Sequence, residues 1–308
     1  MASTTNNTYA LHQPVMLNEV LEFLDVKPKH WYIDATFGRG GHTQAILDKQ
    51  GNVLAIDQDQ EAIKYAQQQF EKFINEERLI VVQQNFSQLT QAVSLLPAGQ
   101  AETAPITGIL FDFGTSLDQI RAPSRGFSFD RHEDPLDMRM NQELGVTAAD
   151  LLTVLSKKQL ADMFKELGGE SQANKIASAI DRHRGKDRSQ RITTVGELLK
   201  IIDQVKERRS HLHPATKVFQ ALRIAVNSEL DSIKQALPQA LDVLVSGGAV
   251  VTIAFHQGED SIVKHLFKEW EQEGKGEILS KKPLQPSAAE TSNNPSARSA
   301  KLRAFKKI

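Results

Sequence analysis

The first 115 residues alternate between short apolar runs and longer amphipathic stretches, and this alternation limits the fold more than any other feature of the chain. The apolar runs have strand length and lie at 31–34, 52–57, 79–83 and 108–112. Between them, apolar side chains recur at helical spacing. Strands that alternate with helices form parallel sheets with right-handed crossover connections. The sequence therefore predicts an α/β fold with a Rossmann-like, doubly wound sheet.

The pattern changes after residue 118, because residues 119–140 are polar and rich in turn formers. Further runs of helical or strand spacing follow at 150–167, 194–205, 214–237, 248–255, 261–270, 277–281 and 299–305. We predict that residues 1–118 and 219–308 form the sheet core, and that 119–218 form an inserted, mainly helical domain that recognises the substrate. Since the insert leaves after the fourth strand, we expect it at the carboxyl edge of the sheet, where such folds bind ligands.

A glycine-rich turn follows the first strand, with Gly38, Gly40 and Gly41 four to seven positions after Asp34. Glycines there let the backbone pass close to a ligand, and the next helix offers unpaired N–H groups. The spacing is GxGG, which differs from the GxGxxG of dinucleotide-binding proteins. The turn alone is equally compatible with a purely structural role, so its function depends on the acidic residues nearby.

Two acidic residues end strands that neighbour this turn. Asp57 ends the second strand and can accept hydrogen bonds from ribose hydroxyls, with Asp59 as the alternative. Asp112 ends the fourth strand and could hold a cationic amino group. An aspartate after a strand can also simply cap a helix. The three features together, at the ends of three strands, predict a site for a nucleoside-type cofactor.

Longer motifs carry a family resemblance. The segments IDATFGRGGHT, LAIDQDQEAI, RGFSF, PLDMRM, HPATKVFQALRIAVNSEL, FHQGEDSIVK and NPSARSAKLR, from His12 to about Arg303, resemble the bacterial small-subunit (16S) ribosomal RNA cytosine-N4 methyltransferase family. The resemblance implies a class I fold with S-adenosyl-L-methionine as cofactor, and the exocyclic N4 amine of a decoding-centre cytidine as target. It also implies ribosomal RNA, within the small subunit, as partner. The cofactor contacts it implies are Gly40, Gly41, His42, Asp57, Phe86, Asp112 and Gln119.

The chain departs from the family pattern in three loops. The family's DLGVSS is here DFGTSL over 112–117, its FHSLEDR has become FHQGEDS over 255–261, and a Gly-Glu-Glu is Gly-Glu-Ser at 169–171. These loops flank the expected target pocket. Two alternatives therefore stay open: a methyltransferase for another amine on RNA, DNA or protein, and a non-catalytic RNA-binding paralogue that retains the fold.

Hydrogen-bond acceptors near a cytosine amine would help methyl transfer, because the amine's lone pair is delocalised into the ring. The candidates are the backbone carbonyls after Asp112 and the side chains of Ser116, Asn227 and His256. Carbon-5 methylation generally needs a cysteine nucleophile, and the chain has no cysteine. His211 and His213 lack supporting ligands, so we expect no metal.

The net charge of −1 means that any nucleic-acid surface must be local. Residues 181–223 hold eleven Lys and Arg against five acids, a local excess that suits phosphate contacts, although such runs are often only a solvated helix face. The predicted RNA contacts are Arg182, Arg184, Arg188, Arg208, Arg209, Lys217 and Arg223. Residues 1–10 lack the pattern of a signal peptide and no apolar run reaches 18 residues, so we expect a cytoplasmic protein without membrane contact.

Overall fold

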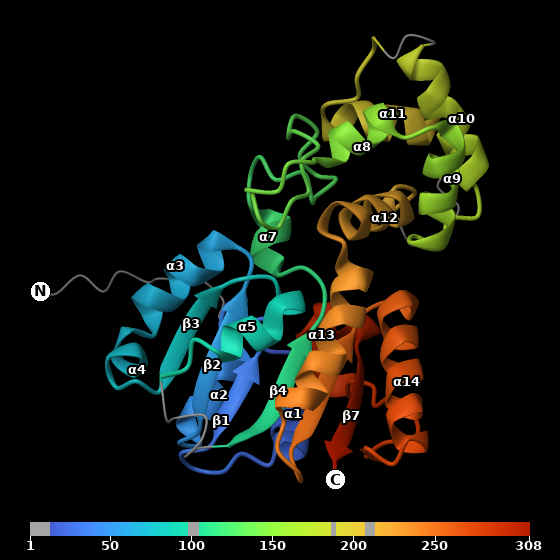
Figure 1. The fold of residues 1–308 in the computed structure, drawn as a ribbon. Coiled ribbons are helices and arrows are strands. Elements are labelled where there is room, and N and C mark those ends of the chain that lie inside the picture. Colours follow the sequence, from blue (N-terminus) through green and yellow to red (C-terminus); the bar gives the residue numbers. More distant parts are fainter. Residues whose placement is uncertain (1–12, 98–104, 186–188, 207–212) are drawn as a thin grey trace, which may run out of the picture.

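A computed structural model describes residues 13–97, 105–185, 189–206 and 213–308. The described residues form a seven-stranded sheet in the order β3-β2-β1-β4-β5-β7-β6, shown in Figure 1. Strands β1 to β5 are parallel, and β7 runs antiparallel to both of its neighbours. The strands are β1 (Trp31–Asp34), β2 (Asn52–Asp57), β3 (Leu79–Gln83), β4 (Ile106–Asp112), β5 (Ala249–Ala254), β6 (Gly276–Ile278) and β7 (Lys301–Lys307).

Helices cover both faces of this sheet, so side chains that alternate along a strand enter two different apolar clusters. Ile33 packs with α5, α13 and α14, whereas its neighbour Tyr32 packs with α1, α2 and α3 on the other face. Burial on both faces explains why the strands read as continuous apolar runs. The core helices are α1 (Leu17–Leu24), α2 (Gly41–Asp48), α3 (Gln60–Gln69), α4 (Glu71–Asn75), α5 (Leu89–Val93), α13 (Glu229–Val243), α14 (Gln257–Gln272) and α15 (Ala288–Asn293).

The insert has an apolar core of its own, and it lies beyond the carboxyl edge of the sheet (Figure 1). Side-chain caps start three of its helices, with Thr147, Ser156 and Thr194 each forming a capping box. The helices between β4 and α13 are α7 (Leu117–Arg121), α8 (Ala148–Val154), α9 (Lys157–Glu166), α10 (Ala173–Arg184), α11 (Val195–Asp203) and α12 (Thr216–Asn227). The predicted fold class, an α/β sheet with a mainly helical insert, is confirmed.

The boundary between insert and core lies later than the sequence predicts. In the sequence, one helical repeat runs through 214–237, but the structure interrupts the helix at Ser228, whose φ is 49° and ψ is 37°. Buried residues of α12 such as Phe219 and Leu222 belong to the insert cluster, and those of α13 belong to the sheet cluster. The predicted boundary at 218/219 therefore moves to Ser228. Apolar periodicity continues across the break, so no pattern in the sequence marks it.

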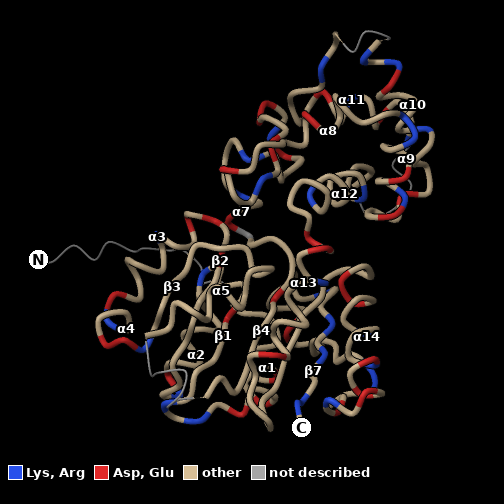
Figure 2. Tube along the Cα trace, in the orientation of Figure 1, with Lys and Arg blue, Asp and Glu red and all other residues tan. Residues whose placement is uncertain are grey.

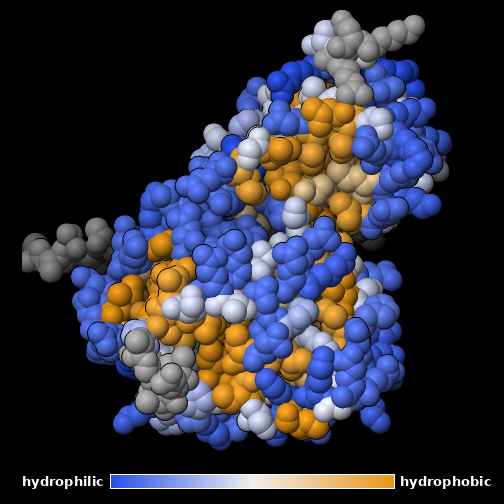
Figure 3. Space-filling model, viewed as in Figure 1, coloured by the Kyte–Doolittle hydropathy of each residue, from blue (hydrophilic) through white to orange (hydrophobic). Residues whose placement is uncertain are grey.

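Charged residues of both signs are mixed along both lobes, in agreement with the net charge of −1 (Figure 2). In the space-filling view of Figure 3, hydrophilic side chains cover the rim of each lobe and apolar ones show between them. Among the described residues, no helix combines the length and the apolar character needed to cross a membrane.

Candidate active site

A cavity of about 290 Å³ lies between the carboxyl edge of the sheet and the insert. The segments that follow β1, β2, β3 and β4 form one wall, and side chains of α12 and α13 contribute to the other. Met140, from the irregular part of the insert, also lines it. A parallel sheet places the ends of its strands side by side, which is why residues far apart in sequence meet here.

The glycine turn after β1 takes a backbone path that other residues would strain. Gly38 has a φ of +54° and Gly40 a φ of +70°. A Cβ on Gly40 would come within 2.5–2.7 Å of the rings of Phe37 and Phe70. Gly40 thus acts from behind the cavity wall, while Gly41 and His42, which begin α2, line the cavity directly.

Asp57 is the partly buried carboxylate at the end of β2. Its Oδ2 accepts a hydrogen bond from the N–H of Gly38 at 2.8 Å, and its Oδ1 accepts one from the N–H of Asp59 at 2.8 Å. Each oxygen keeps a second lone pair, so both can still accept a ligand hydroxyl. Burial raises the pKa of Asp57 to about 6. Asp59, the alternative in the sequence, does not line the cavity.

Two further carboxylates stand beside the first helix turn of α2. Asp34 is buried, burial raises its pKa, and its Oδ2 accepts a 2.7 Å hydrogen bond from the Thr43 hydroxyl. Asp112 lines the cavity, with Oδ2 3.7 Å from Nε2 of His42. Its Oδ1 has no hydrogen-bond partner among the residues that the structure describes. A buried acceptor of this kind fits a ligand that carries a cationic donor.

The other two predicted cofactor residues also line the cavity. Phe86 lies in the short helix η1 (Phe86–Gln88) and packs edge-on against Phe111, with ring centroids 5.8 Å apart. Gln119 is held by both ends of its amide. Its Nε2 donates to Asp59 at 3.0 Å, and its Oε1 accepts from the N–H of Ser116 at 3.1 Å. The cavity therefore brings together Gly41, His42, Asp57, Phe86, Asp112 and Gln119.

The three candidate catalytic side chains differ in their contacts with the cavity and with the rest of the chain. Ser116 lines the cavity and its hydroxyl oxygen caps α7. Asn227 also lines it, but its amide is already committed: Oδ1 accepts from the N–H of Met140, and Nδ2 donates to the carbonyls of Met138 and Arg223. Asn227 thus holds the insert segment around Met140, and its predicted part in catalysis stays a prediction. A mid-helix asparagine gives no signal in the sequence that would distinguish the two roles.

His256 also forms hydrogen bonds within the chain. It is the N-cap of α14, and its Nδ1 accepts hydrogen bonds from the N–H groups of Gly258 and Glu259. That bonding leaves the ring proton on Nε2, which lies 3.0 Å from Oε1 of Glu259. His256 is not among the residues that line the described cavity. The sequence places it at the end of a strand, but only the packed structure shows that its Nδ1 caps a helix and that its ring lies outside the cavity.

Sequence reasoning missed a buried charged cluster at the insert side of the cavity. Arg223 donates to both carboxylate oxygens of Glu229 at 2.9 Å, and its Nη1 lies 3.4 Å from the hydroxyl of Thr115. Burial raises the pKa of Glu229. Possible metal-ligating atoms of Glu229, His256 and Glu259 lie within 4.8 Å of one another. The Arg223 guanidinium already forms an ion pair with Glu229, and this positive charge disfavours a metal ion there.

The predicted RNA contacts fall into three groups. Arg182 is exposed in the last turn of α10, and Lys217 is half-buried with its amine bonded to the carbonyl of Gly169. Arg223 belongs to the cavity cluster, where its guanidinium binds Glu229, and its predicted contact with RNA stays a prediction. Arg184 is corrected, because it is 1% exposed and donates to the carbonyls of Leu152, Thr153 and Leu155 and to Asp181. Arg188, Arg208 and Arg209 lie outside the described residues.

The glycine turn after β1 and the carboxylates that end its two neighbouring strands, β2 and β4, surround one cavity. This is the arrangement of an α/β protein that binds a nucleoside-type ligand at the carboxyl edge of its sheet. The comparison with known families gives the particular group. Residues 9–308 match the MraW methylase family, and the chain belongs to that family.

Relatives of known name are similar over almost their whole length. The chain is 41% identical to a protein named ribosomal RNA small subunit methyltransferase H from Coprothermobacter proteolyticus, covering 97% of each chain. It is also 41% identical to the protein of the same name from Dictyoglomus thermophilum, covering 96% of each. Among solved structures, an rRNA methylase from Streptococcus thermophilus matches with a TM-score of 0.42 and 12% identity, over 95% of this chain and 93% of that one.

Proposed function

We propose that this protein uses S-adenosyl-L-methionine to methylate the exocyclic N4 amine of a cytidine in small-subunit ribosomal RNA. Membership of a methylase family supports the reaction type, and the relatives' names support ribosomal RNA, within the small subunit, as the substrate. The cytosine-N4 target comes from the sequence motifs that this chain shares with that methyltransferase family. The observation that carries the proposal is the convergence of the glycine turn, Asp57 and Asp112 on one cavity that the insert closes.

The chain's own residues suit this cofactor by their chemistry. Asp57 offers two acceptor positions for a pair of ribose hydroxyls, and Phe86 offers an apolar ring for the adenine. Asp112 offers its free Oδ1 to the amino group of the methionyl part. When bound, the cofactor supplies an electrophilic methyl group on a sulfonium. The protein's task is to hold the target amine in line with that methyl group, and good alignment can lower the barrier by about 7–11 kcal/mol.

The target amine belongs on the side of the cavity formed by the loop after β4 and by the insert. Phe113, Gly114, Thr115 and Ser116 line that side. Carbonyl and hydroxyl oxygens of this loop can accept hydrogen bonds from the amine, which stabilises the positive charge that builds on its nitrogen as the new carbon–nitrogen bond forms and the carbon–sulfur bond breaks; the amine then releases one proton to water. Because the Asn227 amide already bonds the chain and His256 does not line the cavity, this loop is the main source of such acceptors.

One experiment separates this function from the alternatives. Purified protein is incubated with methyl-labelled S-adenosylmethionine and small ribosomal subunits, and the RNA is digested to nucleosides. We expect the label in N4-methylcytidine, and none when free large subunits replace the small ones. Label in another nucleoside or in ribosomal protein would point to a different amine, and binding without transfer would point to a non-catalytic paralogue. The altered loops at 112–117 and 255–261 are what keep these alternatives worth testing.

A further inference from the structure

A buried ion pair joins the cofactor side of the cavity to the insert, and none of the predicted roles accounts for it. Arg125, in the irregular segment that enters the insert, reaches Asp59 in the turn after β2, with Nη2 3.1 Å from Oδ2. We propose that Arg125 is a positioning residue, which fixes the insert over the cofactor cavity by binding the core and the insert at the same time. Its catalytic consequence rests on the proposed function.

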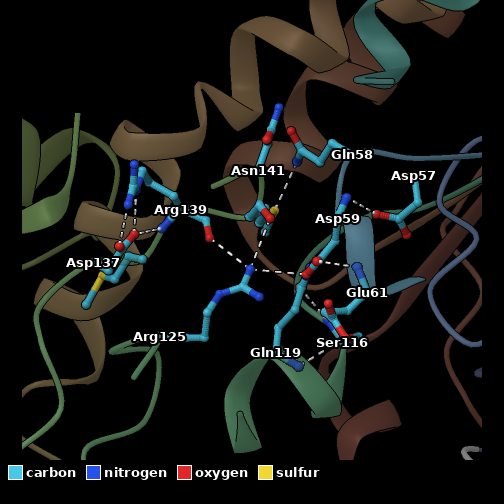
Figure 4. Close-up of polar contacts among 12 residues, drawn as sticks. Asp57, Gln58, Asp59, Glu61, Ser116, Gln119, Arg125, Asp137, Arg139 and Asn141 are labelled. Atoms are coloured by element: carbon cyan, nitrogen blue, oxygen red, sulfur yellow. Dashed lines mark hydrogen bonds and ion pairs between the residues drawn. The ribbon is translucent and has the colours of Figure 1, made fainter. Parts of the chain in front are cut away.

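On the core side, Arg125 binds a carboxylate that is itself rigidly held. Asp59 is the N-cap of α3, where its Oδ1 accepts from the N–H of Glu61, and its own N–H donates to Asp57. Gln119 donates to the same Oδ2 that Arg125 contacts. Figure 4 shows the side chains of Arg125 and Gln119 converging on Asp59, next to Asp57. The guanidinium is therefore attached to the ribose side of the site through one intervening residue.

On the insert side, the same nitrogen of Arg125 donates to the carbonyls of Arg139 at 2.9 Å and Met140 at 3.0 Å. Its main chain is fixed to the same segment, because its carbonyl accepts from the N–H of Met138. Asn227 of α12 holds Met140 from the opposite side. Since Met140 lines the cavity, a shift of this segment would change the wall that the target base meets.

Both partners of this ion pair are buried. The side chains of Arg125 and Asp59 are each 7% exposed, so a small displacement of the insert would weaken the pair without letting water replace either partner. A charge that loses its partner and stays buried is costly, which disfavours small shifts of the insert away from its position over the core. Three acceptors from two lobes share the N–H groups of one guanidinium nitrogen, so these hydrogen bonds can form only in a narrow range of insert orientations.

Distances between spin labels test this role without any assay of activity. The chain has no cysteine, so Lys72→Cys on α4 and Lys158→Cys on α9 give one label in the core and one in the insert. Both side chains are highly exposed, at 77% and 86%. We expect a narrow distance distribution in the otherwise unchanged protein and a broadened or shifted one in Arg125→Met. Arg125→Lys, which can still donate to all three oxygens, is expected to restore most of the narrow distribution.

Arg184→Met is the matched control, because Arg184 is an equally buried arginine whose partners all lie within the insert. It removes a guanidinium and weakens the insert but leaves the Asp59 contact intact. Its distance distribution should stay narrow below the unfolding temperature of the insert. Equal broadening in Arg125→Met and Arg184→Met would overturn the proposal, because it would mean that any loss of stability in the insert frees its orientation.

Kinetics give an independent readout. Misplacement of a reacting group by about 1 Å can cost on the order of 100-fold in rate, so Arg125→Met should lower kcat by on the order of 100-fold while the Kd for S-adenosylmethionine stays near that of the unchanged protein. Asp59→Asn removes the charge to which Arg125 and Gln119 donate, and it should lower kcat by a similar factor. The double variant of Arg125→Met and Asp59→Asn should lose no more in kcat than either single variant. Unchanged kcat in Arg125→Met, or additive losses, would contradict the proposal. If no ribosomal RNA is methylated at all, the spin-label distances still decide it.

Discussion

The sheet core and the helical insert differ in how their polar residues are used. In the core, the carboxylate of Asp57 lies at the end of a strand and keeps lone pairs for a ligand. In the insert, Arg184 and Asn227 look equally available in the sequence, but their polar atoms form hydrogen bonds with backbone groups of the insert. The difference teaches that a strand end in a parallel sheet exposes its side chain to the cleft by geometry, whereas a helix exposes only the face that nothing else covers.

The largest effect should come from the core. Asp57→Ala removes the predicted acceptors for two ribose hydroxyls, each hydrogen bond to a charged group being worth about 1.5–3 kcal/mol. We expect the Kd for S-adenosylmethionine to rise by at least about 100-fold with the fold retained, measured by titration calorimetry and circular dichroism. Glu61→Ala, an exposed acid on the next helix, is the control. Affinity in Asp57→Ala equal to the control would remove the ribose assignment.

A second effect compares one glycine from each lobe at similar φ. Gly40→Ala should destabilise the protein by about 3 kcal/mol, because it combines a left-handed conformation with a clash against two rings. Gly169→Ala has a φ of +60° but nothing within 4 Å of its Cβ, so it should cost only about 1 kcal/mol. Unfolding in urea measures both. Equal losses would mean that packing behind the cofactor turn is looser than the structure indicates.

The raised pKa of Asp57 predicts a pH dependence that the insert does not share. With a pKa of about 6 in the folded protein, only about one tenth of Asp57 is ionised at pH 5, so cofactor affinity should be about 10-fold lower at pH 5 than at pH 8. The sign for stability is opposite. A pKa raised above 3.8 means that the native state binds this proton more tightly, so the group's contribution to stability declines as pH rises from about 4 to 6. Affinity measured by calorimetry that stays constant from pH 5 to 8 would show that ionisation of Asp57 is irrelevant.

The smallest effect concerns the surface of the insert. Arg182→Glu should weaken binding to ribosomal RNA several-fold and reduce the slope of log affinity against log salt by about 1, as expected for one lost phosphate contact. Filter binding at several salt concentrations measures it. Lys72→Glu, an exposed charge on α4 of the core, is the control. An unchanged salt slope in Arg182→Glu would exclude a phosphate contact at this position and would show that the basic end of α10 is a solvated helix face.

Local sequence determined the elements of this protein and the ligand side of its site. Strands β1, β2 and β3 match their predicted ranges, and a capping box at Thr194 starts α11 within the run predicted at 194–205. These features depend on near neighbours: alternation of apolar residues, a side chain that bonds a backbone N–H three positions away, or a glycine that must take a positive φ. Asp57 and Asp112 were predictable because strand ends in one parallel sheet converge.

Only the tertiary structure decided what covers each polar side chain. The burial of Arg184, the capping role of His256, the break at Ser228 and the Asp59–Arg125 pair all join segments whose separation in sequence carries no signal, or arise where periodicity continues unbroken. The sequence does not show whether a charged side chain contacts water, RNA or backbone carbonyl oxygens. Which of these it meets depends on packing between elements, because burial and the number of partners are properties of the assembled chain.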